Sequence, residues 1–167
     1  MRAARERRFR AIADEATPAI GAYIRRRIYP LNASDVDDLV EEVLFIAWRR
    51  LDDIPSGAEV PWLIGVARNV LRNAQRKHRR GEAAAALMAP PHHDASAEDH
   101  VIADEGVRAA LEALSDDDRD IVLLHAWDNR SAAEIAVILG ITTNAAAVRL
   151  SRAQERFRSH FAPTSVA

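Results

Sequence analysis

Apolar side chains recur every three to four residues through most of this chain, and that spacing restricts the fold more than any other feature. The stretch 36–51 carries such a stripe, in which Val36, Leu39 and Val43 are separated by charged and polar positions. Only six glycines are present and β-branched runs are short, so strands have little support. We therefore predict an all-α fold of two small helical domains, residues 1–80 and 107–162, joined by a flexible acidic linker over 81–106.

Proline and capping residues indicate where the helices of the first domain begin and end. Helical spacing extends to Pro30, with a kink expected at Pro18. Ser34 is the predicted N-cap of the next helix, whose first turn carries aspartates where the helix dipole favours anions. This helix is expected to end near Leu51. Pro61 suits the first turn of the third helix, which runs into a basic segment.

The second domain carries the signals of a helix-turn-helix. Ser131 and Glu134 form a capping-box pattern, S-A-A-E, at the start of a short apolar helix. Gly140 can take the left-handed conformation that ends this helix. A few residues later, Thr142 or Thr143 can cap a last, basic helix. A short helix, a glycine turn and a second helix are the layout of this DNA-binding motif.

Charge is unevenly distributed along the chain, although the formal net charge is only −2. Residues 62–80 hold six cations and no acid, and residues 149–158 hold four arginines and one glutamate. Residues 81–120 hold eleven acids and two arginines. Two basic helices separated by an acidic stretch are typical of a protein that contacts nucleic acid through two surfaces. Helices whose cations are merely solvated are the alternative.

Both basic segments combine guanidinium groups with amide or hydroxyl side chains, which suits them to phosphates and base edges. In a helix-turn-helix the second helix enters the major groove, so we expect Arg152 to contact a guanine and Arg149 and Arg156 to clamp phosphates. A self-sufficient helix-turn-helix repressor or activator is an alternative. It would need a dimer interface, and no heptad pattern indicates one.

Residues for other classes of function are scarce. The chain has no cysteine, which excludes disulfides and thiolate chemistry. Its histidines are scattered, so we expect no enzyme, no cofactor and no metal site. The group His92, His93, Asp94 and His100 could bind a metal weakly, but an irregular linker accounts for it better. No apolar run approaches the roughly 20 residues that span a bilayer, so we expect a cytoplasmic protein without membrane insertion.

Three segments resemble motifs of the extracytoplasmic-function (ECF) sigma factors of the sigma-70 family. Residues 35–49, DVDDLVEEVLFIAWR, resemble D-A-E-D-L-V-Q-E-T-F-x-x-A-W-R, and residues 62–69, WLIGVARN, resemble W-L-x-x-I-A-R-N. Residues 131–158 resemble the family's helix-turn-helix. The motifs stand in the family's order and spacing. The resemblance implies an alternative sigma factor, which binds core RNA polymerase and directs promoter-specific transcription initiation.

The resemblance also implies a role for each motif of the first domain. The first motif would dock on the clamp coiled coil of the polymerase β′ subunit, with Trp48 as a buried prop. The loop 56–61 and the basic helix after it would recognise the −10 element and help to melt it. The implied docking residues are Asp35, Asp38, Leu39, Glu42 and Trp48. The implied −10 residues are Trp62, Arg68, Asn69, Arg72, Asn73 and Arg76.

By the same resemblance, the last helix would read the −35 element as duplex DNA. The implied −35 residues are Thr143, Asn144, Ala147, Val148, Arg149, Ser151, Arg152 and Arg156. Ala147 stands where the family often carries Arg or Lys, which leaves fewer side chains for base reading. The other implied partners are the β flap of the polymerase, promoter DNA in duplex and single-stranded form, and an anti-sigma factor.

Overall fold

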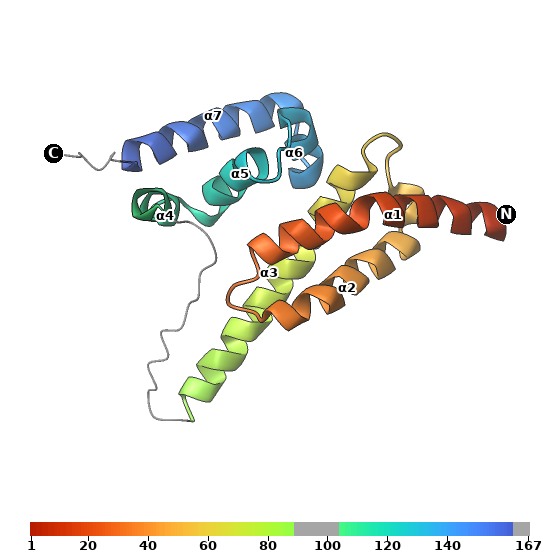
Figure 1. Ribbon diagram of the computed structural model, residues 1–167, viewed down its shortest axis with the longest axis horizontal. Coiled ribbons are helices and arrows are strands. Elements are labelled where there is room, and N and C mark those ends of the chain that lie inside the picture. The colour runs from red at the N-terminus through yellow and green to blue at the C-terminus, as the bar shows by residue number, and fades with distance from the viewer. Residues whose placement is uncertain (89–103, 162–167) are drawn as a thin grey trace. The chain divides into compact units, whose positions relative to one another are not determined.

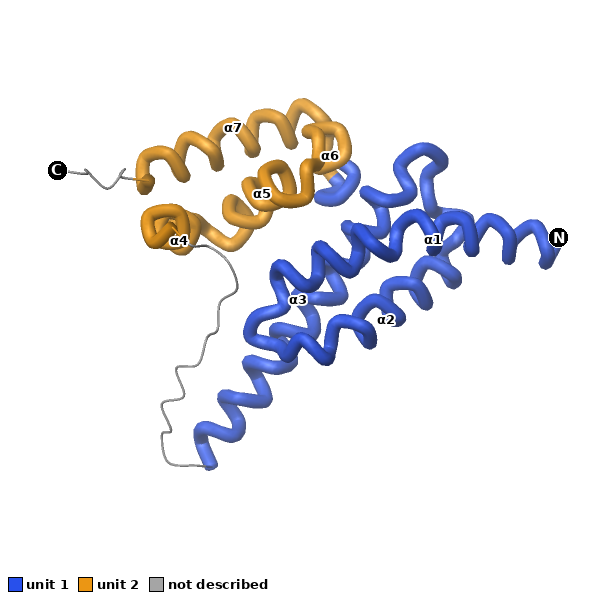
Figure 2. Tube along the Cα trace, in the orientation of Figure 1, with its two compact units in different colours: residues 1–91, 137–140 blue, residues 92–136, 141–167 orange. Residues whose placement is uncertain are grey.

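The computed structural model describes residues 1–88 and 104–161 (Figure 1). Every regular element within these ranges is a helix, so the predicted all-α fold is confirmed. The chain divides into two compact units, residues 1–91 with 137–140 and residues 92–136 with 141–167 (Figure 2). The first unit contains the three N-terminal helices, and the second contains the basic C-terminal helix.

Three helices that all contact one another build the first unit. They are α1 (Arg2–Arg26), α2 (Val36–Arg49) and α3 (Glu59–Ala86), with short 3₁₀ turns η1 (Ala33–Asp35) and η2 (Leu51–Asp53). Their apolar stripes meet in a common core. Its largest fully buried side chains are Ile20, Tyr23, Ile24, Val43, Leu51, Leu63 and Ile64. Because each stripe is used in this core, the opposite face of each helix is left to polar residues.

The chain enters α2 through η1 rather than through the predicted N-cap. The Asn32 backbone N–H donates to Asp35 Oδ2 at 2.9 Å, and the Asp35 N–H donates to the Asn32 carbonyl at 2.9 Å. Ser34 lies inside this turn, so its prediction as N-cap is wrong. The physical reason is that Asn32 and Asp35 already close the turn reciprocally, and α2 begins directly after it.

Two elements differ in extent from their sequence signals. Pro18 lies inside α1, which continues on both sides of it. α3 continues past residue 80 to Ala86 and so occupies the start of the range expected for the linker. The stretch 89–103, with its histidines, lies outside the described residues. The boundaries 1–80, 81–106 and 107–162 stay a prediction.

Four helices follow in the second part of the chain, and the last of them contacts the first two. They are α4 (Glu105–Glu112), α5 (Asp116–Ala126), α6 (Ala132–Leu139) and α7 (Thr143–His160). Ser115 Oγ accepts the Asp118 N–H at 3.2 Å and caps α5. Thr142 Oγ1 accepts the Ala145 N–H at 3.1 Å, so Thr142 caps α7. These caps satisfy backbone donors that a helix start leaves without partners.

α6 and α7 form the predicted helix-turn-helix, with 104° between the two helices. Gly140 has a φ of 65°, the left-handed conformation predicted for it. At the start of α6, the Ser131 N–H donates to Glu134 Oε2 at 2.8 Å and the Glu134 N–H donates to Ser131 Oγ at 3.2 Å. The predicted capping box is therefore confirmed. No single described helix is long and apolar enough to cross a membrane; α6 and α7 meet that requirement of length and composition only as a bent pair.

The capping box also sets the protonation of Glu134. Burial by itself would raise the pKa of Glu134, but hydrogen bonds from Ser131 and the charge of Arg130 outweigh it and lower the pKa. Arg130 Nη1 donates to Glu134 Oε1 at 3.0 Å. Because the pKa is lower in the folded than in the unfolded chain, the ionised carboxylate stabilises the fold above the unfolded pKa. That contribution is lost as the pH falls through the folded pKa.

We predict that Glu134→Ala lowers the free energy of unfolding of the second unit by about 1 kcal/mol at neutral pH, because it removes half of the capping box. The difference from wild type should shrink as the pH falls through the pKa of Glu134. Urea denaturation of the full chain, followed by circular dichroism at neutral and acidic pH, measures both effects. Glu155→Ala, on the exposed face of α7, is the control, and an equal loss there would contradict the capping role.

Candidate nucleic-acid interface

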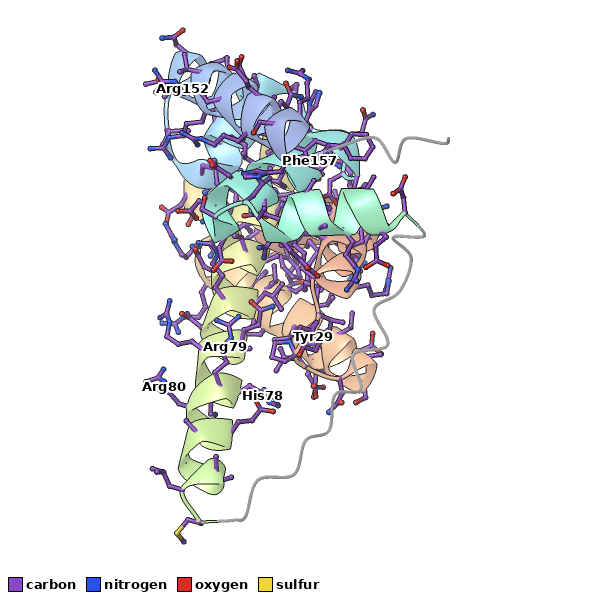
Figure 3. The ribbon with its side chains drawn as sticks, turned by 90° about the vertical axis from the view of Figure 1, so that its left-hand side faces the viewer. Tyr29, His78, Arg79, Arg80, Arg152 and Phe157 are labelled. Carbon is purple, nitrogen blue, oxygen red and sulfur yellow. The ribbon has the colours of Figure 1, made fainter. Side chains whose placement is uncertain are left out.

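The cationic face of α3 lies outside the stripe that the helix buries. Leu63, Val66 and Val70 are buried. Of the predicted −10 residues, Asn69, Asn73 and Arg76 are exposed, and Trp62, Arg68 and Arg72 are partly buried. Further along the helix, His78 and Arg80 project from opposite sides of α3 (Figure 3). α3 therefore presents amide and guanidinium groups over several successive turns.

The turn between η2 and α3 is exposed at its tip and anchored at its start. Ile54 is 2% exposed, whereas residues 55–57 are exposed. Gly57 has a φ of 83°, a conformation that favours glycine. The last three residues of the predicted 56–61 loop belong to α3, so the exposed turn is shorter than predicted.

The predicted docking residues on α2 divide into an exposed pair and two side chains that support it. Asp38 and Glu42 are exposed and stand one helical turn apart. Leu39 is 7% exposed and belongs to the core, so it holds the helix in place rather than forming part of its outer surface. Trp48 is partly buried rather than fully buried, and its ring packs edge-on against Phe9 with 5.3 Å between centroids.

One exposed aromatic side chain on α2 is absent from the predicted set. Phe45 is 60% exposed, and the Arg49 guanidinium lies 5.8 Å from its ring centroid. Phe45 follows Glu42 by three residues, so the two share a face of the helix. Helical spacing could have predicted the exposure of Phe45, because residue 45 lies outside the buried stripe 36, 39, 43 and 47.

α7 buries three small or aliphatic side chains, Ala146, Leu150 and Ala153, and turns its polar residues outward. Each of the eight predicted −35 residues is exposed. Val148 is among them at 39% exposure, whereas Leu150 is buried at 8%. Arg152 lies on the outer side of α7 (Figure 3). The helix therefore presents the whole predicted set to solvent on a surface that carries four arginines and one acid between residues 149 and 158.

Arg156 takes part in a contact that links two helices of the second unit. Its Nη1 donates to Asp118 Oδ2 on α5 at 2.5 Å. The side chains are 56% and 20% exposed, respectively. Part of the positive charge of α7 is therefore compensated within the protein. The two residues are 38 positions apart, and no sequence pattern connects them.

A metal centre is the other kind of site that the sequence weakly suggested. Within residues 1–88 and 104–161, no group of three or more His, Asp or Glu side chains is placed to hold a metal ion. The predicted weak group His92, His93, Asp94 and His100 lies outside these ranges. The candidate functional surfaces are the exposed charged faces of α2, α3 and α7.

The sequence model of sigma-70 region 2 matches residues 14–81, and that of sigma-70, region 4 matches residues 104–156. The first match covers about half of α1, all of α2 and α3 up to its last turns. The second covers α4 to α6 and most of α7. The two candidate nucleic-acid surfaces, on α3 and α7, therefore fall in different regions of the same family.

Named relatives agree with these matches. The chain is 36% identical over 134 residues to the probable RNA polymerase sigma factor RfaY of Xanthomonas campestris pv. campestris. This match covers 74% of this chain but only 33% of that protein's length. It is 33% identical over 132 residues to the ECF RNA polymerase sigma factor EcfG of Rhodopseudomonas palustris, covering 75% of this chain and 70% of that protein.

Among solved structures, the sigma factor RpoE in complex with the anti-sigma factor NepR from Bartonella quintana is similar, with a TM-score of 0.60 and 25% identity over 91% of this chain and 95% of that chain. CnrH in complex with the cytosolic domain of CnrY has the same fold, with a TM-score of 0.59 and 24% identity over 92% of this chain and 87% of that chain.

The chain belongs to the sigma-70 family of RNA polymerase sigma factors, and within it to the ECF group. It is a transcription initiation factor that directs promoter recognition by RNA polymerase, and not an enzyme.

We predict that Asp118→Ala and Arg156→Ala are coupled by about 0.5 kcal/mol in the free energy of unfolding, because the pair is partly exposed and its attraction is screened. A double-mutant cycle by urea denaturation measures this coupling. Asp118→Ala combined with Arg158→Ala is the matched control, since Arg158 is also an exposed cation of α7. A coupling no larger than in the control would mean that the pair does not stabilise the packing of α5 on α7.

Proposed function

We propose that this sigma factor divides its work among three surfaces: α2 docks on the polymerase, the turn 55–57 and α3 recognise the −10 element, and α7 reads the −35 element. The observation that carries the proposal is the separation of charge. The exposed face of α2 carries acids, whereas those of α3 and α7 carry cations. Residues 1–80 would act as the docking and melting domain, residues 81–106 as the linker and residues 107–162 as the duplex-reading domain.

The exposed face of α2 suits a basic protein surface, and we assign it to the clamp coiled coil of the β′ subunit. Asp38 and Glu42 supply charge, and Phe45 supplies an apolar anchor of the kind that dominates interface energies. Leu39 and Trp48 support this helix from the inner side, and Asp35 fixes the turn at its start. Negative charge here also disfavours DNA phosphates, which keeps this face for protein.

The face of α3 suits the −10 element, where the duplex opens. Extruding a base costs a few kcal/mol, which must be offset by contacts to the base and to the single strand. Asn69 and Asn73 are exposed amides that can bond to base edges, and Arg76 is an exposed cation for the phosphates. Arg68, Arg72 and Trp62 flank them. Because residues 62–80 lack acids, nothing on this stretch repels the DNA.

α7 suits duplex DNA at the −35 element. Its N-terminal residues, from Thr143 to Ser151, would lie in the major groove, with Arg152 on a guanine and Arg149 and Arg156 on phosphates. Ala147 offers no polar group, so base reading falls on few side chains. We therefore expect modest sequence selectivity at this element.

Further partners follow from the same proposal. The similarity of this chain to RpoE, whose structure was solved with the anti-sigma factor NepR, supports an anti-sigma factor as an inhibitor that covers the docking surface. We also assign the β flap of the polymerase to the second domain, and promoter DNA as both duplex and single strand. The protein would act in the cytoplasm, at the nucleoid when bound to polymerase.

We predict that replacing Asp38 and Glu42 with Ala abolishes binding to core RNA polymerase, because it removes two of the four exposed acids of α2, and leaves the fold intact because both residues are exposed. Fluorescence titration with core enzyme, together with thermal unfolding, measures the two effects. Asp14→Ala with Glu15→Ala removes two exposed acids from α1 and should bind normally. Unchanged core affinity of the α2 variant would overturn the docking assignment.

Tight, specific duplex binding by the protein alone, with no gain from core enzyme, would favour a self-sufficient repressor or activator.

We predict that Arg152→Ala reduces the dependence of transcription on particular −35 bases, by about 1–3 kcal/mol of discrimination at the contacted pair. Arg156→Ala should weaken promoter binding for all sequences alike and lower the salt slope by about one unit. Run-off transcription on a set of −35 variants, repeated across salt concentrations, separates the two. A base-specific effect of Arg156→Ala would mean that the assigned orientation of α7 in the groove is wrong.

A further inference from the structure

Two arginines in the first turns of α1 reach across to residues 48–54, which contain the end of α2 and η2. Arg5 Nη1 donates to Asp52 Oδ2 at 2.6 Å, and its Nη2 donates to the Trp48 carbonyl at 3.0 Å. Arg8 Nη2 donates to the Ile54 carbonyl at 2.8 Å. These contacts join segments that are 43 to 47 residues apart in the chain.

The contacts of Arg5 satisfy groups that the end of a helix leaves without partners. α2 ends at Arg49, so the Trp48 carbonyl is one of the last four, which have no donor within the helix. A cation at this end also matches the negative pole of the helix dipole. The Arg5 guanidinium lies 5.4 Å from the centroid of the Trp48 ring, which adds a cation–π contact. Arg5 thus holds both the backbone and the ring at the end of α2.

Arg8 holds the next part of the chain, where the exposed turn begins. Ile54 is the last anchored residue before residues 55–57. After the turn, the chain enters α3, where the ring of Trp62 lies 5.2 Å from the Arg50 guanidinium. The turn therefore begins next to Ile54, which Arg8 holds, and ends at a helix that contacts Arg50.

We propose that Arg5 and Arg8 are positioning residues for promoter recognition: they hold residues 48–54 so that the turn 55–57 is already shaped to receive a −10 base. This inference rests on the proposed role of that turn. A turn that is ordered before binding loses less conformational entropy when DNA binds, and the saving appears as affinity and selectivity. Both arginines precede residue 14, where the region 2 match begins, so the brace is a feature of this chain beyond that match.

The same segment supplies its own control. Arg7 and Arg10 lie in the same turns of α1 and are exposed. Replacing either pair removes two positive charges from one helix, but only Arg5 and Arg8 contact the end of α2 and η2. A direct attraction of the basic N-terminus to DNA would respond to both pairs alike, whereas a brace responds to one.

The experiment compares three variants of the full chain with core polymerase: Arg5→Ala with Arg8→Ala, Arg8→Ala alone, and Arg7→Ala with Arg10→Ala. Run-off transcription from promoters with single −10 substitutions measures base discrimination, and hydrogen exchange of the backbone amides of residues 56–58 measures order in the turn. We expect the first pair to lose about tenfold in discrimination, the scale of one lost charge-assisted hydrogen bond, with faster exchange. Arg8→Ala should lose part of this, at normal core affinity. The control pair should keep wild-type discrimination and exchange.

A fourth variant separates failure of this inference from failure of the proposed function. Pro55→Gly with Ser56→Gly alters the turn and leaves both arginines in place. Suppose that this variant loses discrimination, but that the Arg5, Arg8 pair discriminates as well as the Arg7, Arg10 control pair. That result would overturn the brace and keep the turn as the −10 reader. Discrimination unchanged in the turn variant would overturn the role of the turn itself. A loss of core affinity in Arg8→Ala as large as its loss of discrimination would mean a general structural role, and would also overturn the brace.

Discussion

The burial of one apolar stripe on α3 is the constraint on which the first unit depends. Leu63, Val66 and Val70 lie in the core with α1 and α2, and each fully buried side chain of this kind contributes about 1.5–3 kcal/mol. The orientation of α3 about its own axis is therefore fixed, and this orientation determines which of its residues face solvent. α7 follows the same logic with smaller side chains. Its buried Ala146 and Ala153 let it pack closely on its neighbours while its arginines point outward.

The helices and the helix-turn-helix could be predicted from the sequence because their signals are local. The capping box joins residues three apart, and Gly140 needs only its own backbone to end α6. Ser34 shows where local signals stop. Serine, asparagine and aspartate all suit an N-cap, and the stretch 32–35 contains each of them. The reciprocal bonds of Asn32 and Asp35 decide between them, and they exist only because the chain tightens into a 3₁₀ turn there.

The contacts between distant segments could not be predicted, because an arginine in a basic helix looks the same whether it is solvated, bound to phosphate or paired with a carboxylate. Arg5 and Asp52 are 47 residues apart, and Arg156 and Asp118 are 38 apart. Only the folded chain shows that these cations have partners within the protein. The exposure of Phe45 is a different case. Helical spacing places it off the buried stripe of α2, so its exposure follows from a local pattern that the sequence contains.

The arrangement of charge explains why a factor with two basic helices should depend on a protein partner to bind promoters. Each phosphate contact contributes to affinity, and Arg156 already shares its charge with Asp118 on α5. Ala147 removes a further side chain from the surface that we assign to the −35 element. The last helix alone therefore offers few strong contacts. Two DNA-binding surfaces gain affinity when a third body holds both over one DNA molecule, since the second contact then forms at a high effective concentration. The acidic face of α2, which DNA repels, is the surface suited to that third body.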